Sequence, residues 1–335
     1  MNNIKTIAEI GNTHEGSLGL AKQFIKSAAE CGVDAVKFQV HIFDAESLPT
    51  APNPPYFKDE SRKEYFERTS FTQHEWSKLK DYAEIECGVE FLASPFSIEA
   101  VDLLESLGVK TFKIASGEVT NLPMLQKIGQ LRKSVLLSSG MSYWSEIDAA
   151  VQCLTDNGCD DLTLLQCTSD YPCLPENSGL NILDEIRKRY PQHKIGYSDH
   201  TLGFAIPIAA VCKGATVIEK HFTLSKQMYG SDAQFSSEPD ELKSLVEALR
   251  AVQKGLSYEV DKDFKAQNLG DMKNTFEKMI VAARELSKGT ILRESDLAYK
   301  KPMDGIPASK YKLVIGQKLQ QDLLKDMPII MDLNE

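Results

Sequence analysis

Eight short runs rich in apolar and β-branched residues recur along the chain, and each is followed by a stretch whose apolar residues repeat with helical spacing. The runs are TIAEIG (6–11), DAVKFQV (34–40), VEFLASPF (89–96), KTFKIAS (110–116), SVLLSSG (134–140), LTLLQCT (162–168), KIGYSD (194–199) and TVIEKHF (216–222). Near-continuous apolar strands are typical of parallel sheets covered on both faces. Eight such units within about 250 residues predict an α/β fold, the (β/α)8 TIM barrel.

A doubly wound open sheet is the alternative arrangement of alternating strands and helices. It would be expected to carry a glycine-rich dinucleotide loop, GxGxxG, after its first strand. The first predicted strand instead runs into IGNTHEG (10–16), which lacks that pattern. The loop sequence therefore favours the closed barrel.

The pattern changes after Gly255. Residues 257–275 are polar and lack a clear period, which predicts a linker. From residue 276 onward, short strand-like runs and tight turns such as SKGT predict a small β-rich module. A module of about 60 residues buries little core of its own, so we expect it to dock on another surface. The predicted domains are a barrel over 1–256, a linker over 257–275 and a small domain over 276–335.

Charge limits the partners that this chain can bind. Its 335 residues include 38 Lys and Arg against 48 Asp and Glu, for a formal net charge of −10. This balance disfavours a broad surface for nucleic acid or for an anionic membrane. A small anionic substrate stays possible, because a few cations inside a cleft decide such binding.

Cysteine usage indicates a reducing compartment. The seven cysteines are scattered, odd in number and without a CxxC pair, which predicts reduced thiols rather than disulfides or a structural zinc site. The amino terminus enters a strand pattern with no charged-then-apolar leader, and no apolar run approaches the roughly 20 residues that span a bilayer. We therefore expect a cytoplasmic protein.

Polar and charged residues gather where the predicted strands end. Barrels of this type carry their catalytic groups at the carboxyl ends of the strands and in the loops that follow. The residues at these positions are Glu9, Asn12, His14, Lys37, Gln39, Ser94, Lys113, Ser116, Glu118, Ser138, Ser139, Thr168, Ser169, Tyr171, Ser198, Asp199, His200, Glu219, Lys220 and His221. A single serine of this kind is more often a helix cap, but the whole set predicts one site at the mouth of the barrel.

Lys37 and Lys113 lie within apolar strands, and a buried lysine needs an anionic partner. That partner could be Glu9 or Glu118, in which case the pairs are structural. It could also be the phosphate or carboxylate of a ligand. The hydroxyl groups predicted near both lysines favour a phosphate pocket.

His200 and His221 end neighbouring predicted strands at equivalent positions, so their imidazoles can converge. Neutral imidazoles suit Mn²⁺, Fe²⁺, Co²⁺ or Zn²⁺, and two protein ligands leave room for water and a substrate oxygen. Acid–base or hydrogen-bonding roles without a metal are the alternative. The pattern alone leaves both open.

Several segments together resemble the sialic acid synthases, which are the N-acetylneuraminate synthases and their legionaminic and pseudaminic acid relatives. The resemblance is collinear over the barrel and extends into the tail, which resembles the antifreeze-like (SAF) domain of that family. The segments are AEIGNTHEG (8–16), DAVKFQ (34–39), KIASGEVTNLPML (113–125), LLSSGM (136–141), LLQCTSDYP (164–172), GYSDHTLG (196–203), IEKHFTL (218–224), VAARELSKGTILRESDL (281–297), KKPMDGI (300–306) and IGQKL (315–319).

The resemblance implies a transferase. Members of the family condense phosphoenolpyruvate with an N-acylated hexosamine, such as N-acetylmannosamine or a 2,4-diacetamido-6-deoxyhexose, to a nine-carbon 2-keto acid and phosphate. It also implies a divalent metal, Mn²⁺ or Mg²⁺, held by His200 and His221, that polarises the aldehyde of the open sugar. A domain-swapped homodimer is implied as well, in which the C-terminal domain of one chain caps the barrel of the other.

The resemblance further implies roles for individual residues. Lys37, Lys113, Ser116, Ser138, Ser169 and Ser198 would bind phosphoenolpyruvate. Glu118, Tyr171, Asp232 and Lys301 would lie at the sugar, with Tyr171 also next to the phosphoenolpyruvate pocket. The catalytic residues would be Glu9 as general acid/base, Lys113 and His221.

Departures from the family pattern fall on the sugar side. Thr13 stands where relatives commonly have Asn, GSDAQFS (230–236) where many have GPDHxxS, and Lys301 where Arg is usual. A lysine cannot form the bidentate contacts of an arginine, so the acceptor sugar stays open. The alternatives are another phosphoenolpyruvate-dependent 3-deoxy-sugar-acid synthase, which acts on a different aldose, and a non-catalytic carbohydrate-binding or antifreeze-like protein.

Overall fold

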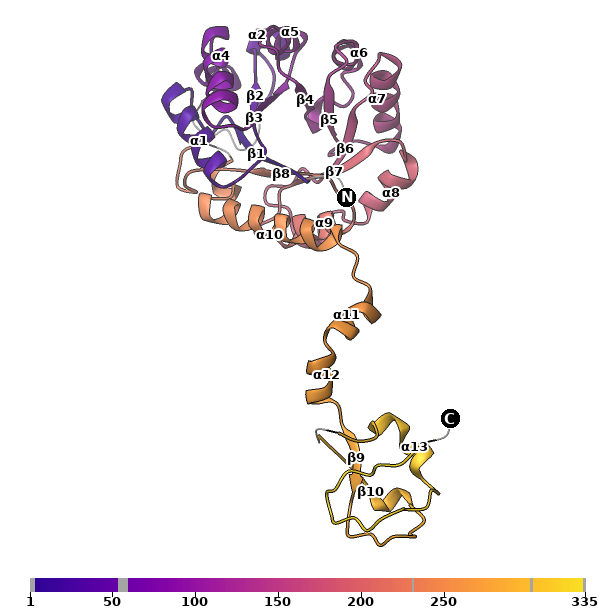
Figure 1. Ribbon diagram of the computed structural model, residues 1–335. Helices are drawn as coiled ribbons and strands as arrows, with labels where there is room; N and C mark the ends of the chain where they lie inside the picture. The colour runs from indigo at the N-terminus through magenta and orange to yellow at the C-terminus, as the bar shows by residue number, and fades with distance from the viewer. Residues whose placement is uncertain (1–3, 54–59, 231, 302–303, 334–335) are drawn as a thin grey trace. The chain divides into compact units, whose positions relative to one another are not determined.

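The computed structural model describes residues 4–53, 60–230, 232–301 and 304–333. The chain divides into two compact units, Met1–Tyr258 and Glu259–Glu335 (Figure 1). Residue 231 of the GSDAQFS segment and residues 302–303 of the KKPMDGI turn lie outside the described residues. Among the helices that are described, none combines the length and the apolarity needed to cross a membrane.

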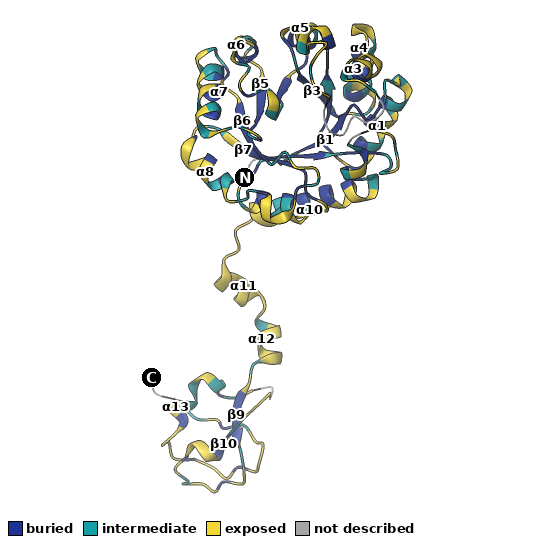
Figure 2. Ribbon diagram, turned by 180° about the vertical axis from the view of Figure 1, so that it is seen from behind, coloured by how far each residue is buried: buried dark blue, intermediate teal, exposed yellow. Residues whose placement is uncertain are grey.

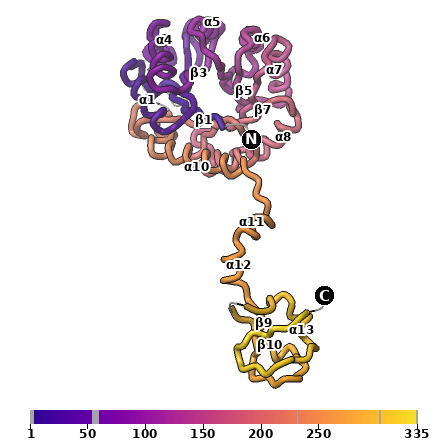
Figure 3. Tube along the Cα trace, in the orientation of Figure 1, coloured from indigo at the N-terminus to yellow at the C-terminus, as the bar shows by residue number. Residues whose placement is uncertain are grey.

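The first unit is a closed barrel of eight parallel strands, as the sequence predicts. The strands follow one another around the ring in chain order, and Figure 3 shows the chain making one circuit from β1 to β8. The strands are β1 Lys5–Gly11, β2 Ala35–Val40, β3 Glu90–Pro95, β4 Thr111–Ile114, β5 Ser134–Ser138, β6 Leu162–Cys167, β7 Lys194–Asp199 and β8 Val217–His221.

Helices cover the outside of the barrel (Figure 1). The segment between β2 and β3 carries several of them, and serine or threonine caps α3 and α4 through capping boxes at Ser61 and Thr72. The helices of this unit are α1 Leu18–Glu30, α2 Phe43–Glu46, α3 Arg62–Thr69, α4 Gln73–Asp81, α5 Ile98–Ser106, α6 Leu122–Gln130, α7 Trp144–Asp156, α8 Ile182–Arg189, α9 Ala205–Cys212 and α10 Pro239–Ser257.

Two apolar layers hold the barrel together, and Figure 2 shows its strands buried behind helices with exposed outer faces. Alternate residues of each strand point outward under the helices and join the main core. The others point inward, and Ile7, Ala35, Leu92, Leu136, Leu165 and Val217 form a separate cluster inside the ring. Gly196 makes room for this layer, since a Cβ there would lie 2.2 Å from Cδ2 of Leu165. The apolar layer fills the lower barrel, so polar side chains are left for the mouth.

The second unit has a small core of its own. An antiparallel pair, β9 Met279–Ala282 and β10 Leu297–Lys300, packs with the short helix α13 Tyr311–Val314. The buried side chains of this core are Ile280, Ala282, Leu286, Leu292, Leu297, Ile306, Val314, Leu319, Leu323 and Ile329. The predicted small β-rich domain is therefore confirmed.

The predicted linker, residues 257–275, is more regular than its composition suggests. α10 extends to Ser257, and two short helices follow, α11 Lys262–Asn268 and α12 Gly270–Phe276. Neither short helix has a buried residue. Their apolar residues therefore show no helical period in the sequence, because neither helix has a face that packs against a core.

Candidate active site

Strand alternation decides which of the strand-end residues reach the barrel interior. Glu9 pairs in register with Lys37 on β2 and with His221 on β8, and Ser198 pairs with Glu219. All of these have the inward parity of the strands. The neighbours Asp199 and Lys220 have the opposite parity and form their own buried ion pair, with Nζ 2.6 Å from Oδ2. The polar triplets are Ser198, Asp199 and His200 at the end of β7, and Glu219, Lys220 and His221 at the end of β8. Only the first and third residues of each triplet enter the site.

Glu219 is the centre of the buried charges. Nζ of Lys113 lies 2.7 Å from its Oε1 and 2.9 Å from its Oε2. Nζ of Lys37 lies 3.0 Å from Oε1 of Glu219 and 3.3 Å from Oε2 of Glu9. Ser198 donates to Oε1 of Glu219 over 3.0 Å. The sequence indicated that both lysines need an anionic partner, but it gave Glu219 no role.

Of the two partners expected for the lysines, only Glu9 takes that place. Glu118 instead lies on the turn after β4, where it accepts a hydrogen bond from Nδ2 of Asn121 over 2.9 Å. Burial raises the pKa of the Glu118 carboxyl. Glu118 is therefore set apart from the lysine cluster and stays a prediction as a sugar-binding residue.

The charge in this cluster is unevenly shared among its four groups. Burial opposes ionisation of Glu219, but the Lys113 and Lys37 ammonium groups hold its pKa well below the usual range. Burial and the neighbouring Glu219 charge raise the pKa of Glu9, although Lys37 acts in the opposite direction. Burial, together with the charge of Lys37, lowers the pKa of Lys113 despite Glu219. Lys37, whose pKa is raised by Glu219 and Glu9 despite its burial, and Glu219 are therefore the firmly charged pair, whereas Lys113 loses its proton more readily and Glu9 ionises less readily.

Serine hydroxyl groups line the same part of the barrel. Gly140 shows their convergence, because a Cβ there would lie 2.5 Å from Oγ of Ser169 and 2.6 Å from Oγ of Ser116. The Oγ atoms of Ser94 and Ser138 are buried and have no hydrogen-bond partner among the described residues. Buried polar atoms are normally satisfied, so these two hydroxyls are suited to a ligand.

His200 and His221 converge, as the sequence predicts, with ring centroids 5.3 Å apart. Tyr171 packs against both rings, with its centroid 4.2 Å from that of His200 and 5.8 Å from that of His221. Nδ1 of His221 lies 3.8 Å from Oδ2 of Asp232. The predicted residues Tyr171 and Asp232 are therefore next to the histidine pair.

The histidine pair fits a divalent metal with open coordination positions. Nδ1 of His200 lies 2.7 Å from the carbonyl oxygen of Thr168, which fixes a donor at Nδ1 and leaves the Nε2 lone pair for a metal. Burial, and then the charge of His200, lower the pKa of His221 well below its usual value, which favours the neutral ligand form. Burial lowers the pKa of His200, but Cys167, the Thr168 carbonyl and Glu219 together raise it above its usual value. Over residues 4–53, 60–230, 232–301 and 304–333, no group of three or more His, Cys, Asp or Glu is arranged to hold a metal.

Other predicted residues lie elsewhere. Lys301 is in the second unit, with Nζ 4.9 Å from the centroid of the Phe276 ring. His14 is buried against Phe71, with centroids 4.7 Å apart, and its Nδ1 accepts from the backbone N–H of Gly16 over 3.1 Å. His14 is therefore a packing residue rather than part of the lysine and histidine clusters.

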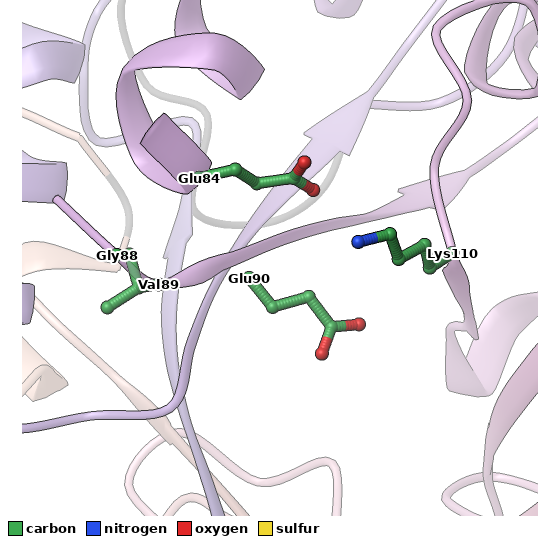
Figure 4. Close-up of a pocket in the computed structure, with 5 residues that line it drawn as sticks. All are labelled: Glu84, Gly88, Val89, Glu90 and Lys110. Carbon is green, nitrogen blue, oxygen red and sulfur yellow. The ribbon is translucent and has the colours of Figure 1, made fainter. Parts of the chain in front are cut away.

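A separate cavity of about 250 Å³ opens where β3 begins, lined by Glu84, Gly88, Val89, Glu90 and Lys110 (Figure 4). Its Glu90 carboxylate pairs with Lys5, with Nζ 2.7 Å from Oε2. The cavity is at the amino ends of the strands, whereas Lys37 and Lys113 face the carboxyl ends. Residues at this end of a barrel serve stability rather than catalysis.

Sequence comparisons cover both units. The model of the NeuB family matches residues 24–261, and that of the SAF domain matches residues 277–332. The N,N'-diacetyllegionaminic acid synthase of Campylobacter jejuni is 39% identical over 329 residues, which is 96% of this chain and 97% of that protein. The N-acetylneuraminate-9-phosphate synthase of Homo sapiens is 36% identical over 336 residues, which is 98% of this chain and 91% of that protein.

A solved structure agrees with the sequence comparisons. The N-acetylneuraminic acid synthetase of Leptospira borgpetersenii, in complex with citrate, superposes with a TM-score of 0.69 at 31% identity. The match covers 82% of this chain and 93% of that one. The barrel, the converging strand-end residues and these matches lead to one conclusion. This chain belongs to the NeuB family, as a synthase that joins the family's barrel to a SAF domain.

Proposed function

We propose that this protein condenses phosphoenolpyruvate with an N-acylated hexosamine, N-acetylmannosamine or a 2,4-diacetamido-6-deoxyhexose. C3 of phosphoenolpyruvate forms a bond to the aldehyde carbon of the open sugar, water adds at C2, and phosphate leaves. The product is a nine-carbon 2-keto acid. The observation that carries the proposal is the buried Lys37, Lys113 and Glu219 cluster, which lies in the same barrel as a converging histidine pair.

Phosphoenolpyruvate would bind at the lysine cluster. Its phosphate and carboxylate would accept hydrogen bonds from the ammonium groups of Lys37 and Lys113. They would also accept hydrogen bonds from the hydroxyl groups of Ser116, Ser138, Ser169 and Ser198. Charge-assisted hydrogen bonds of this kind are stronger than neutral ones. The unsatisfied Oγ of Ser138 and the convergence of both lysine side chains on one point inside the barrel support this placement.

Glu9 is suited to acid–base work at C2. Its side chain is buried, its pKa is raised by burial, and its Oε1 accepts from Gln39 over 2.8 Å. Its Oε2 has no hydrogen-bond partner among the residues described, although Nζ of Lys37 is 3.3 Å away. A carboxylate with one oxygen held and the other open could orient the attacking water and take its proton. Lys113 would stabilise negative charge on the reacting phosphoenolpyruvate.

His200 and His221 would hold Mn²⁺ or Mg²⁺. When bound there, such an ion polarises the aldehyde carbonyl of the sugar as a Lewis acid. Tyr171 packs against both imidazoles and restricts their orientation. Asp232 and Glu118 would bind hydroxyl groups of the sugar, with Tyr171 next to both substrates.

We also propose a domain-swapped homodimer, which exposed apolar side chains at the mouth of the barrel support. Exposed apolar side chains gather on the loops after β5, β6 and β7, and we assign them to a second copy of the C-terminal unit, whose Lys301 would then reach the sugar. The rim residues are Met141, Tyr143, Tyr171, Leu174, Leu202 and Phe204. Deleting residues 276–335 should abolish turnover or reduce it sharply while the barrel keeps its circular dichroism spectrum. Full activity of the isolated barrel would contradict the capping role.

We place the protein in the cytoplasm. All seven cysteines are free thiols in the structure, and free thiols persist in a reducing compartment.

A substrate panel tests the proposed reaction. Phosphate release should be measured from phosphoenolpyruvate and Mn²⁺ with N-acetylmannosamine, with 2,4-diacetamido-6-deoxyhexoses and with phosphorylated aldoses. We expect release with one of the N-acylated sugars and none without a sugar. Release with phosphorylated aldoses alone would contradict the proposal and favour a synthase of other 3-deoxy sugar acids.

A further inference from the structure

The imidazole of His41 follows β2 directly and is enclosed between two phenylalanine rings. Its centroid lies 3.8 Å from that of Phe66 and 4.0 Å from that of Phe96. The side chains of His41 and Glu46 are only 7% and 8% exposed. A phenylalanine would fill such an apolar sandwich equally well. A polar ring costs free energy there unless it is hydrogen-bonded, so the imidazole requires a reason beyond packing.

Both ring nitrogens of His41 have a polar neighbour. Nδ1 lies 2.8 Å from Oε1 of Glu46, and Nε2 lies 3.2 Å from Oε1 of Gln39. Gln39 in turn donates from Nε2 to Oε1 of Glu9 over 2.8 Å. Four side chains, from α2, β2, β1 and the residue that follows β2, thus form one continuous hydrogen-bond chain that ends on Glu9 inside the barrel.

The direction of the bonds follows from the chemistry of the end groups. Gln39 turns its NH₂ group to Oε1 of Glu9 and its carbonyl oxygen to His41, and a carboxyl oxygen accepts the first of these bonds. Nε2 of His41 donates to that oxygen and Nδ1 donates to the Glu46 carboxylate, an arrangement in which both ring nitrogens carry a proton. Without His41 the carbonyl oxygen of Gln39 loses its donor, so only Glu9 holds the carboxamide and the two side chains can shift together.

The end of the chain is also tightly enclosed. A Cβ at Gly11 would lie 3.3 Å from Nε2 of Gln39 and 3.5 Å from Oε1 of Glu9. Gly11 has φ of +54°, a left-handed conformation that favours glycine. Small shifts of Gln39 therefore change where the Glu9 carboxylate can lie.

We propose that His41 and Glu46 are positioning residues for Glu9. They fix the orientation of the Gln39 carboxamide, and Gln39 fixes the carboxylate that handles water at C2. The role rests on the proposed function, because Glu9 has its chemistry only there. It also gives the helical segment after β2 a purpose in catalysis, since Glu46 is the last residue of α2.

The decisive variant is His41→Phe, which keeps the ring sandwich and removes both hydrogen bonds. We expect kcat to fall about 10- to 100-fold, the range that small misplacements of a catalytic group produce, with KM for phosphoenolpyruvate within about threefold of wild type. In a Glu9→Gln background the same substitution should change kcat by less than about twofold, because no carboxylate remains to be positioned.

Glu46→Gln provides an independent test, since it leaves His41 and both phenylalanines in place and applies even where His41→Phe fails to fold. Like His41→Phe, it should lower kcat. The matched control is Glu75→Gln, which weakens the cap of α4 at Thr72 and has no link to Glu9. It should lower the unfolding midpoint without lowering kcat.

Crystal structures give a measurement that does not depend on turnover. In His41→Phe the Gln39 carboxamide should move from its wild-type position, and the Glu9 carboxylate should move with it. Wild-type kcat in His41→Phe and Glu46→Gln, an equal loss in the Glu9→Gln background, or unchanged positions of Gln39 and Glu9 would overturn the proposal. A wild-type protein that releases no phosphate with any sugar contradicts the proposed function instead, and the crystal structures then decide the role of His41 alone.

Discussion

Lys113 and Glu219 form an ion pair across the interior of the barrel, with Nζ 2.7 Å from Oε1. The two residues are on β4 and β8, which stand opposite each other in the closed ring of eight strands. Both side chains are at most 5% exposed. Lys37 on β2 shares the same carboxylate. Glu219 therefore neutralises charge contributed by two other strands.

Replacing Glu219 with Gln should destabilise the barrel. Two buried ammonium groups would lose their shared partner, and breaking a buried pair typically costs about 3–5 kcal/mol. The free energy of unfolding should be measured in urea, with Asp161→Asn as the control, because its pair with Lys194 is half-exposed and worth about 1 kcal/mol or less. Inorganic phosphate should restore more stability to Glu219→Gln than to the wild type. An equal loss of unfolding free energy in Glu219→Gln and Asp161→Asn would contradict the central role of Glu219.

Gly140→Ala should weaken binding of phosphoenolpyruvate. The added methyl group would meet Oγ of Ser169 at 2.5 Å and Oγ of Ser116 at 2.6 Å, so both hydroxyls must move. We expect KM for phosphoenolpyruvate to rise by about tenfold, the cost of one good hydrogen bond. Gly255→Ala is the control, because a Cβ there has no neighbour within 4 Å. An unchanged KM would place these serines outside the phosphoenolpyruvate pocket.

His221→Ala should remove metal-dependent turnover and leave the fold intact. Loss of a metal ligand exceeds the 10- to 100-fold effect of outer-shell changes, so we expect a loss of about 100-fold or more. Phosphate release should be measured with and without added Mn²⁺, and folding by circular dichroism. His193→Ala, a histidine in the turn before β7, should behave as wild type. A His221→Ala variant that kept its rate would exclude the metal-binding role.

The stability of the barrel should depend on the protonation of His14. Burial lowers the pKa of His14 to about 3, whereas the unfolded chain binds this proton near pH 6.5. The unfolded state therefore holds more protons between these values, and the stabilising contribution, complete above about pH 6.5, is lost as the pH falls toward 3. The free energy of unfolding should change by at most about 1.4 kcal/mol per pH unit through this group.

Urea unfolding at pH 7 and pH 5 measures this effect. His14→Phe keeps a ring against Phe71, and it should show a smaller drop in unfolding free energy between the two pH values than the wild type. An equal drop in both proteins would assign the acid sensitivity to other groups.

Local sequence was enough to predict the barrel and much of its site. The run at 216–222 predicted β8 Val217–His221, and the run at 34–40 predicted β2 Ala35–Val40, because a near-continuous apolar run reflects burial on both faces of a strand. The convergence of His200 and His221 followed from their equivalent places on neighbouring strands. The helices α11 and α12 were missed, since they bury no face and so leave no period in the sequence.

The sequence by itself determined the order of strands and helices and the residue types at the strand ends, because both depend on neighbours along the chain. Only the tertiary structure decided which of these residues meet. Closure of the ring brings Lys113 to Glu219 over 106 positions, and strand parity sends Lys220 outward to Asp199. The hydrogen-bond chain from Glu46 to Glu9 likewise depends on packing between β1, β2 and α2. Contacts across a closed barrel arise from its geometry, which no local pattern records.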